Sequence, residues 1–310
     1  MGFKVGRQAI RYADNRIWGP GDWGNVGRYA WDAAKLLYEG PRADVDFVFG
    51  DRIRFDPYDF DGEHYKFHAY CVYASIKELP CKLDLFWVKK ESRENYVVSP
   101  RGDTARLDLH TLGFHVDGKF RKHWDYRGTF AYQFGGYNGA PVRAYGAHAR
   151  TGYTLPGPYK PRLGFEYSHG SGDPNPGAGA YQTFDGVFGA IDMMYGRMNL
   201  FSWRNLHDYQ TQLSVQPTEK TKIVLDWHFF ELDRARDAWY YCNGRPQRQD
   251  PTGASGRALG HEIDLVARYR HNKYLELQAG YAHFFAGEFI HNTGPSPDAD
   301  WVFVQVYYKL

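Results

Sequence analysis

The fold is decided by the last fifty residues, which read HEIDLVARYRHNKYLELQAGYAHFF from His261 and DADWVFVQVYYKL from Asp298 to the end. In the first stretch, Ile263, Leu265, Ala267 and Tyr269 alternate with Asp264, Val266, Arg268 and Arg270 up to the turn at residues 271–273, and the alternation then resumes. A period of two predicts β-strands. Each strand has one apolar face and one charged face, so the medium that meets the apolar face determines what kind of protein this is.

The composition narrows the choice to a β-structure. The 310 residues include 25 Tyr, 21 Phe and 9 Trp, and no apolar run approaches the roughly 18 residues that a spanning helix needs. With a mean hydropathy of −0.62, a bundle of membrane helices is excluded. A membrane barrel can be this polar, because only every second strand residue faces lipid. The net charge of +2 identifies no class of partner, and we expect no nucleic-acid partner.

Strand-like stretches recur along the whole chain, and their even number, about fourteen, is typical of bacterial outer-membrane barrels. The predicted spans are 3–12, 27–38, 43–54, 64–75, 80–90, 105–117, 122–135, 142–154, 161–170, 204–216, 221–233, 258–270, 274–286 and 299–310. We find no linker between domains, so residues 1–310 are expected to form one barrel domain.

The connections between these spans alternate between long and short. The long ones are predicted near 13–26, 55–63, 91–104, 136–141, 171–203, 234–257 and 287–298, and the short ones at 40–41, 76–78, 117–119, 156–158, 217–219 and 271–273. Outer-membrane barrels have short periplasmic turns and long extracellular loops. The sequence therefore predicts an antiparallel transmembrane β-barrel with both chain ends at the periplasmic rim. Residues 171–203 and 234–257 are expected to fold over or into the mouth, although surface loops without a role are equally compatible with the sequence.

The charged faces of the strands predict a polar, water-filled lumen. Arginine suits an anionic solute, because its planar guanidinium binds a carboxylate through two hydrogen bonds. A lumen with this lining would lower the barrier for anions, whereas arginines paired with acidic neighbours would only rigidify the wall. The predicted pore-lining residues are Arg7, Arg11, Lys35, Arg127, Arg150, Asp208, Asp264, Arg268, Arg270 and Glu276.

No motif predicts catalysis, a cofactor or a metal site. The 13 His have no metal-ligand spacing, and GxSxG is absent. His261 beside Glu262 is a weak acid/base candidate for an alternative function, an outer-membrane enzyme. Cys71 and Cys81 could face each other across a hairpin, either as a disulfide or as free thiols in contact with lipid. A soluble β-structure that binds sugar through its aromatic residues is the third possibility.

Four motifs resemble the alginate export family of outer-membrane barrels. They are VGRQAIRYADNRIWGPGDWGNVGR at residues 5–28, LFSWRNLHDYQ at 200–210, GHEIDLVARYRHNKYLELQAGYAHFFAGEFI at 260–290, and the C-terminal DADWVFVQVYYKL. The resemblance implies a passive outer-membrane conduit for an anionic polysaccharide such as alginate in a Gram-negative bacterium, with an electropositive constriction and periplasmic secretion proteins as further partners. It also implies that Arg7, Arg268 and Arg270 line the pore. A general anion- or nutrient-selective porin is the alternative.

The chain departs from the family's pattern in two ways. The secretion porin that typifies the family has about eighteen strands, whereas about fourteen are predicted here. The chain would then either lack N-terminal strands of an 18-stranded barrel or be a smaller relative. Its last residue is Leu310, where such barrels usually end in Phe.

Overall fold

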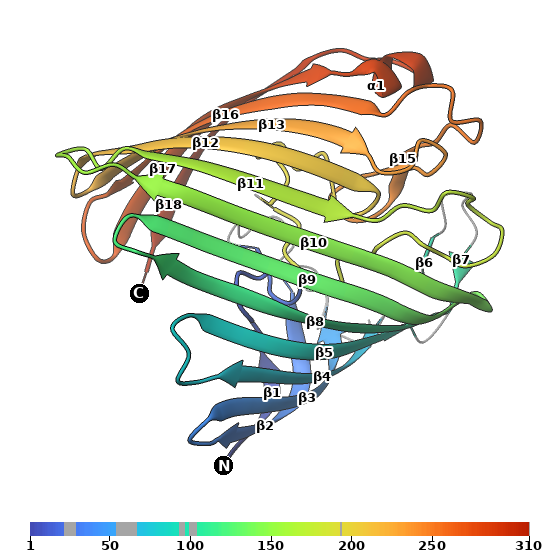
Figure 1. The fold of residues 1–310 in the computed structure, drawn as a ribbon, viewed down its shortest axis with the longest axis horizontal. Coiled ribbons are helices and arrows are strands. Elements are labelled where there is room, and N and C mark those ends of the chain that lie inside the picture. The colour runs from blue at the N-terminus through green and yellow to red at the C-terminus, as the bar shows by residue number, and fades with distance from the viewer. Residues whose placement is uncertain (22–28, 54–66, 93–96, 99–103, 193, 310) are drawn as a thin grey trace.

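The computed structural model describes residues 1–21, 29–53, 67–92, 97–98, 104–192 and 194–309. Fourteen strands form one antiparallel sheet in sequence order and curve around a common interior (Figure 1). They are β1 (Gly2–Gln8), β2 (Ala30–Glu39), β3 (Ala43–Ile53), β4 (Phe67–Ile76), β5 (Lys82–Ser92), β8 (Leu107–Phe120), β9 (Trp124–Tyr137), β10 (Ala140–Thr154), β11 (Arg162–Gly170), β12 (Leu206–Thr218), β13 (Thr221–Leu232), β16 (Ala258–Arg270), β17 (Leu275–Ala286) and β18 (Ala299–Tyr308).

Smaller elements lie in the connections. They are β6 (Val97–Val98), β7 (Thr104–Ala105), β14 (Trp239–Tyr240), β15 (Pro246–Arg248) and the helix α1 (Glu288–Thr293). Each of the two short strand pairs forms its own two-stranded sheet. In the described part of the chain, no helix has the length and apolar character needed to cross a bilayer.

The predicted strands agree closely with the observed ones, with two differences. The first strand ends at Gln8 and not near residue 12, because the chain turns inward there and buries Ile10 and Tyr12. The connection at 136–141, predicted to be long, is a tight turn through Asn138 (φ 48°) and Gly139 (φ 80°). Two consecutive positive φ values are typical of a type I′ hairpin, which continues the twist of both strands. The predicted loop at 55–63 and most of 91–104 lie outside the described residues.

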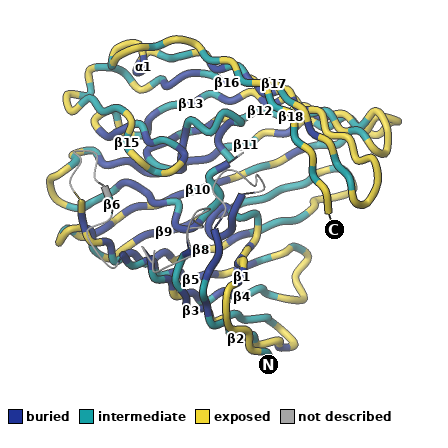
Figure 2. The backbone as a smooth tube through the Cα atoms, turned by 180° about the vertical axis from the view of Figure 1, so that it is seen from behind, coloured by how far each residue is buried: buried dark blue, intermediate teal, exposed yellow. Residues whose placement is uncertain are grey.

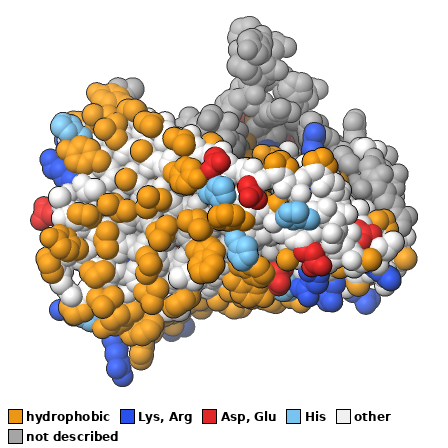
Figure 3. Space-filling model, turned by 90° about the horizontal axis from the view of Figure 1, so that it is seen from above, with side chains coloured by type: hydrophobic (Ala, Val, Ile, Leu, Met, Phe, Trp, Pro, Cys, Tyr) orange, Lys and Arg blue, Asp and Glu red, His pale blue; other side chains and the backbone are white. Residues whose placement is uncertain are grey.

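The outward face of the sheet is apolar. Large hydrophobic side chains such as Phe49, Leu112, Tyr132, Trp227 and Leu265 are exposed on successive strands. The space-filling view shows hydrophobic side chains covering much of one side of the wall (Figure 3). Because exposed aromatic and aliphatic rows of this kind face lipid in membrane barrels, the expectation that the apolar face looks outward is confirmed.

Pairing in the sheet starts at β1 and ends at β18. Within the described residues, neither of these strands has a second neighbour in the sheet. Because a second neighbouring strand is missing from the part of the chain that the structure describes, their outward side chains are highly exposed: Phe3 is 73% exposed and Val304 is 77% exposed. The two strands are therefore the edges of the wall as the structure has it.

Two chain segments fold into the interior, residues 9–21 and residues 171–205, which we call the inward segments. Trp18 of the first forms a parallel bridge with Phe188 of the second. The rings of Trp18, Trp31 and Phe188 lie with centroids 4.7–5.0 Å apart, and all three side chains are buried. Figure 2 shows buried backbone along the strands and in the interior, while the short turns are exposed. The hydrophobic core thus lies inside the barrel wall, where the inward segments pack against it.

Candidate functional site

Most of the predicted pore-lining residues lie on the inner face of the wall. Strand register and alternation place Arg127, Arg150, Asp208, Asp264, Arg268 and Glu276 on the face opposite the exposed aromatic residues. Lys35 lies on this face too, and its Nζ is 2.5 Å from Asp46 Oδ2. Arg270 follows the same alternation at the end of β16. Arg11 belongs to the inward segment 9–21 and donates a hydrogen bond to Pro20 O at 3.4 Å.

Arg7 lies on the other face. It shares the outward side of β1 with Phe3 and Val5, and it pairs across the strands with Asp32, with a distance of 2.9 Å between Nε and Oδ1. The structure therefore places Arg7 outside the lumen, because the parity of the strand orients it with its apolar neighbours.

Basic side chains gather on the inner wall toward the end that carries the short turns, which we call the short-turn half. Arg127 Nε donates to Asp117 Oδ2 at 2.6 Å, and Arg162 holds Asp125 through two nitrogens at 2.6 and 2.9 Å. These two arginines are neutralised by their carboxylates. Each of these ion pairs therefore presents little net charge to the lumen.

Other cations in the short-turn half are less well paired. Arg150 donates to the amide oxygen of Gln212 at 3.0 Å, and its nearest carboxylate contact, with Glu166, is 3.9 Å long. Lys222 is exposed and forms no ion pair or hydrogen bond with any described residue. The short-turn half therefore carries positive charge that the wall itself does not neutralise.

Arg268 and Arg270 share one acidic partner. Glu276 on the neighbouring strand β17 lies 3.2 Å from Arg268 Nε and 3.6 Å from Arg270 Nε. The two arginine side chains remain 44% and 67% exposed. One carboxylate between two guanidinium groups leaves a net positive charge facing the lumen at the end of β16.

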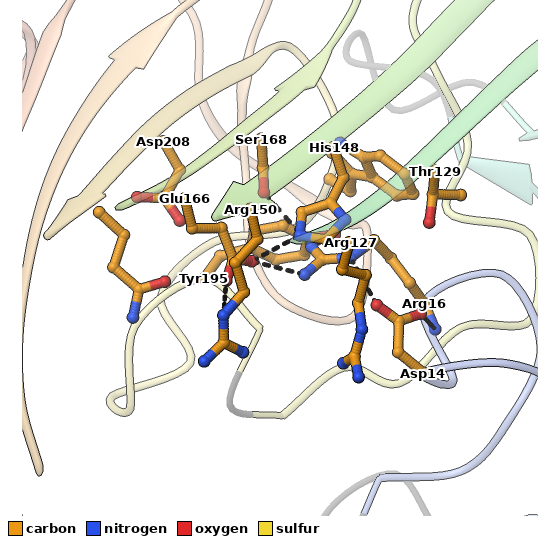
Figure 4. Close-up of polar contacts among 12 residues, drawn as sticks. Asp14, Arg16, Arg127, Thr129, His148, Arg150, Glu166, Ser168, Tyr195 and Asp208 are labelled. Atoms are coloured by element: carbon orange, nitrogen blue, oxygen red, sulfur yellow. Dashed lines mark hydrogen bonds and ion pairs between the residues drawn. The ribbon is translucent and has the colours of Figure 1, made fainter. Parts of the chain in front are cut away.

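A buried arginine of the first inward segment links that segment to the wall (Figure 4). Arg16 Nη2 donates to Glu166 Oε1 at 2.7 Å, and Nη1 donates to the hydroxyl groups of Tyr195 and Ser168 at 3.1 and 3.3 Å. Asp14 Oδ2 lies 3.5 Å from Arg16 Nε. Arg16 thereby joins both inward segments to β11.

The charges of this cluster support each other. Burial alone would lower the pKa of Arg16, but its neighbours Tyr195, Glu166 and Asp14 raise it above the usual value. Burial would likewise raise the pKa of Asp14, but the Arg16 guanidinium, together with His148, His115 and the backbone N–H of Arg16, outweighs this and holds the pKa of Asp14 below the usual value. Both groups are therefore charged at neutral pH.

A second buried cluster fixes the other inward segment. Asp185 Oδ1 accepts from Lys90 Nζ at 2.7 Å, and Asp185 also pairs with Arg204. The backbone of Asp185 exchanges two hydrogen bonds with the side-chain amide of Gln133 on β9, at 2.7 and 2.8 Å. Asp185 therefore connects the segment to two separate strands of the wall.

The acidic side of the wall is largely engaged by the same segment. Glu262 Oε1 accepts from the backbone N–H of Met198 at 2.9 Å, and Asp264 Oδ2 accepts from that of Arg197 at 3.2 Å. Asp208 is another predicted pore-lining residue, and its Oδ1 lies 2.8 Å from His228 Nδ1, within hydrogen-bonding distance. These carboxylates are buried. They hold the fold of the interior and do not present free negative charge to a solute.

Sequence reasoning missed Arg16, Lys90, Asp185 and Arg204 as parts of the site. Three of them lie in connections that have no periodicity. Lys90 follows the alternation of β5, but its partner is 95 residues away. Two arginines could have been recognised from the sequence, Arg204 in the WRN motif and Arg16 in the ADNR stretch. A charged residue among aromatic ones is usually buried with a partner of opposite charge.

The strand register also shows where the acid/base candidates His261 and Glu262 and the thiol of Cys71 point. His261 shares the outward row with Ile263, whereas Glu262 points inward, so the two cannot act on one substrate. Cys71 is a buried free thiol that pairs in register with Val88, so it neither faces Cys81 nor contacts lipid.

Comparison with known proteins agrees with this architecture. Among solved structures, the chain is similar to OccK11 (OpdR) of Pseudomonas aeruginosa, with 12% identity and a TM-score of 0.58 over 98% of this chain and 76% of that one. It is also similar to the outer membrane protein OprD of Pseudomonas aeruginosa, with 10% identity and a TM-score of 0.57 over 98% and 74%. At these identities the likeness concerns the fold. A comparison with curated protein sequences finds no match.

The family model described as alginate export matches residues 1–303, nearly the whole chain. This match agrees with the motifs at residues 5–28, 200–210 and 260–290. The chain therefore belongs to the alginate export family and is a β-barrel protein of the Gram-negative outer membrane.

Proposed function

We propose that this outer-membrane channel passes an anionic polysaccharide such as alginate, passively, through an electropositive lumen. The observation that carries the proposal is the unneutralised positive charge of the short-turn half. Among the described residues, Arg150 donates to an amide oxygen and has its nearest carboxylate contact at 3.9 Å, and Lys222 forms no ion pair or hydrogen bond. Arg268 and Arg270 add a surplus charge, since they share one glutamate.

Charge placed on the inner wall acts strongly on a solute. Low-dielectric walls focus the field of the lining groups into the lumen and raise the local concentration of counter-ions. Each sugar unit of a polyuronate carries a carboxylate, and guanidinium binds carboxylate through two parallel hydrogen bonds. A series of cations on β10, β13 and β16 would offer successive weak sites, which favours passage over retention.

A general anion-selective porin is the second candidate, and the inward segments favour it. Residues 9–21 and 171–205 are held in the interior by buried ion pairs to β5 and β11. A small anion can pass beside such segments, whereas a polymer has to thread past them or displace them. The two candidates therefore differ in the size of the solute and agree on the sign of its charge.

The charge proposal is tested by recording refolded protein in a planar bilayer under a salt gradient. We expect a reversal potential that shows anion selectivity, and we expect the double variant Arg150→Gln/Lys222→Gln to lose most of it. Lys273→Gln is the matched control, because Lys273 lies in the exposed turn after β16 and contacts the Tyr274 ring. Cation selectivity of the wild type would overturn the proposal.

The size question is settled in the same apparatus. Alginate oligomers of increasing length, added to one side, should interrupt the anion current, and a dwell time that grows with length would indicate threading. Block by a monomeric uronate with no effect of longer oligomers would instead favour the general porin.

A further inference from the structure

We infer that His169, His207 and Asp233 form a binding site for Zn²⁺ or a similar transition-metal dication on the outer wall of the barrel. The site lies at the end opposite the short turns, where β11 ends and β12 begins. It is separate from the lumen, and the inference does not depend on the proposed function.

Three side chains distant in sequence meet here because of the strand register. His169 on β11 and His207 on β12 are direct cross-strand partners, in the outward row that also contains Tyr167 and Tyr209. Asp233 follows the last residue of β13, the strand that pairs with the other edge of β12. The spacing 169, 207, 233 matches no metal motif, so only the folded sheet brings these residues together.

The donor atoms converge on one point. The Nε2 atoms of His169 and His207 lie 3.3 and 3.2 Å from the same oxygen, Asp233 Oδ1. All three ligand atoms lie within 4.8 Å of one another. The imidazole rings are nearly parallel, with centroids 4.4 Å apart and an angle of 5° between the planes. Both nitrogens can therefore approach a single ion beside the carboxylate.

One donor in this group has no hydrogen bond. His169 Nε2 is buried and, among the described residues, makes no well-formed hydrogen bond; its polar contact is the ion-pair distance of 3.3 Å to Asp233 Oδ1. The three side chains are only 9–14% exposed, so water hardly compensates. A buried polar atom without a hydrogen bond destabilises a fold, and a metal ion would coordinate this nitrogen and the other two donors together.

The surroundings orient the ligands in the manner of a metal site. The Tyr167 hydroxyl lies 2.8 Å from His207 Nδ1, on the far side of the ring from Asp233. Asp233 Oδ2 accepts a hydrogen bond from the backbone N–H of Gly172 at 2.9 Å. A ligand histidine nearly always has its second nitrogen hydrogen-bonded in this way, which fixes its tautomer and ring orientation.

The donor set selects the class of metal. Two imidazole nitrogens and one carboxylate oxygen suit Zn²⁺ and related dications, whereas Ca²⁺ and Mg²⁺ prefer oxygen ligands. Three protein ligands leave one tetrahedral position for water or another donor. Because Gly172 lies at the start of the inward segment 171–205, a bound ion would also fix the point where that segment leaves the wall.

The test uses the refolded full chain in detergent, freed of metal by a chelator and titrated with Zn²⁺, and with Co²⁺ for its visible absorption. We expect one ion per chain, a rise in the unfolding temperature with Zn²⁺, and little effect of Mg²⁺ or Ca²⁺. His169→Gln and His207→Gln should abolish the response. His261→Gln should keep it, since His261 is another outward-facing histidine whose described contacts are the rings of Trp227 and Phe229.

Tyr167→Phe keeps the test decisive if a histidine variant fails to fold. Tyr167 is a positioning residue, and loss of its hydroxyl should weaken Zn²⁺ binding about 10–100-fold without abolishing it. Binding of Zn²⁺ with unchanged affinity in the His169→Gln or His207→Gln variants would overturn the inference. Absence of one-to-one binding in the wild type would overturn it as well, and the two histidines would then serve only as ion-pair partners of Asp233.

Discussion

Replacing Asp185 by Asn should release the second inward segment while leaving the barrel wall intact. Asp185 is 6% exposed and neutralises two buried cations, Lys90 and Arg204. Burial alone would raise the pKa of Asp185, but Arg204 and Lys90 outweigh it and hold the pKa below the usual value. The carboxylate is therefore ionised at neutral pH, and the amide of Asn removes its charge but preserves its shape.

The size of the effect follows from the charges that remain. Removing one partner of a buried ion pair costs about 3–5 kcal/mol, because the other charge stays buried without compensation. Every 1.4 kcal/mol is a factor of ten in an equilibrium, so the ratio of seated to released segment should fall by about two to three and a half orders of magnitude. The strands of the sheet keep their own backbone hydrogen bonds, so the stability of the wall should change much less.

The assay is single-channel recording in a planar bilayer, with electrophoretic heat-modifiability as the check on barrel folding. We expect Asp185→Asn to show a larger mean current and more frequent open–closed transitions than the wild type. Asp250→Asn is the matched control, because among the described residues that carboxylate accepts hydrogen bonds only from its own loop, at Thr252 and Ser255. Adding Lys90→Met to Asp185→Asn should restore part of the wild-type behaviour, since it removes one of the two orphaned cations.

A folded Asp185→Asn barrel with the current and noise of the wild type would refute this reasoning. It would show that the aromatic contacts alone seat the segment and that the ion pairs contribute nothing to its position.

Three further predictions concern the same interior. Gly146→Val should also unseat the segment, because a Cβ at this strand position would lie 2.6 Å from the buried ring of Phe184; overpacking of this kind costs about 1–3 kcal/mol, and current recordings would detect it. Trp18→Ala should destabilise the inward contacts by about 3–5 kcal/mol, because it leaves a cavity among buried rings, and increased protease sensitivity of residues 171–205 would show it. The third prediction concerns pH, because the pKa of Asp14 is lowered beside Arg16. The stability that ionised Asp14 contributes to the folded protein is fully present above the pKa of the unfolded chain and is lost as pH falls through the lowered folded value. The current should therefore increase below about pH 4 and stay constant above it.

The strands could be predicted because lipid and lumen impose a strict alternation on every one of them. In β9, Phe130, Tyr132 and Phe134 face outward, and Arg127 and Gln133 face inward, as the period of two requires. The same rule would have placed Arg7 outward with Phe3 and Val5, had parity been given more weight than charge and motif. Alternation therefore identifies the face of a residue more reliably than its chemical type does.

The interior could not be predicted in the same way. Arg16, Asp185 and Asp233 act through partners on distant strands, and the segments that carry them have no repeating pattern. Their positions follow from packing in three dimensions, for example from the small residue Gly146, which leaves space for Phe184. Charge type alone suggested a cationic lumen, but which cations are neutralised depends on neighbours that only the register reveals.

The bare edges of β1 and β18 have a consequence for the protein in its bilayer. A ten-residue strand such as β18 directs about half of its peptide groups away from its one neighbour. Hydrocarbon contains no water to hydrogen-bond them, and each unsatisfied group costs several kcal/mol. Summed along both strands, this penalty exceeds the net stability of an ordinary domain. The unpaired edges of β1 and β18 therefore cannot face acyl chains. Both edges must form interstrand hydrogen bonds along their length for the protein to be stable in the membrane.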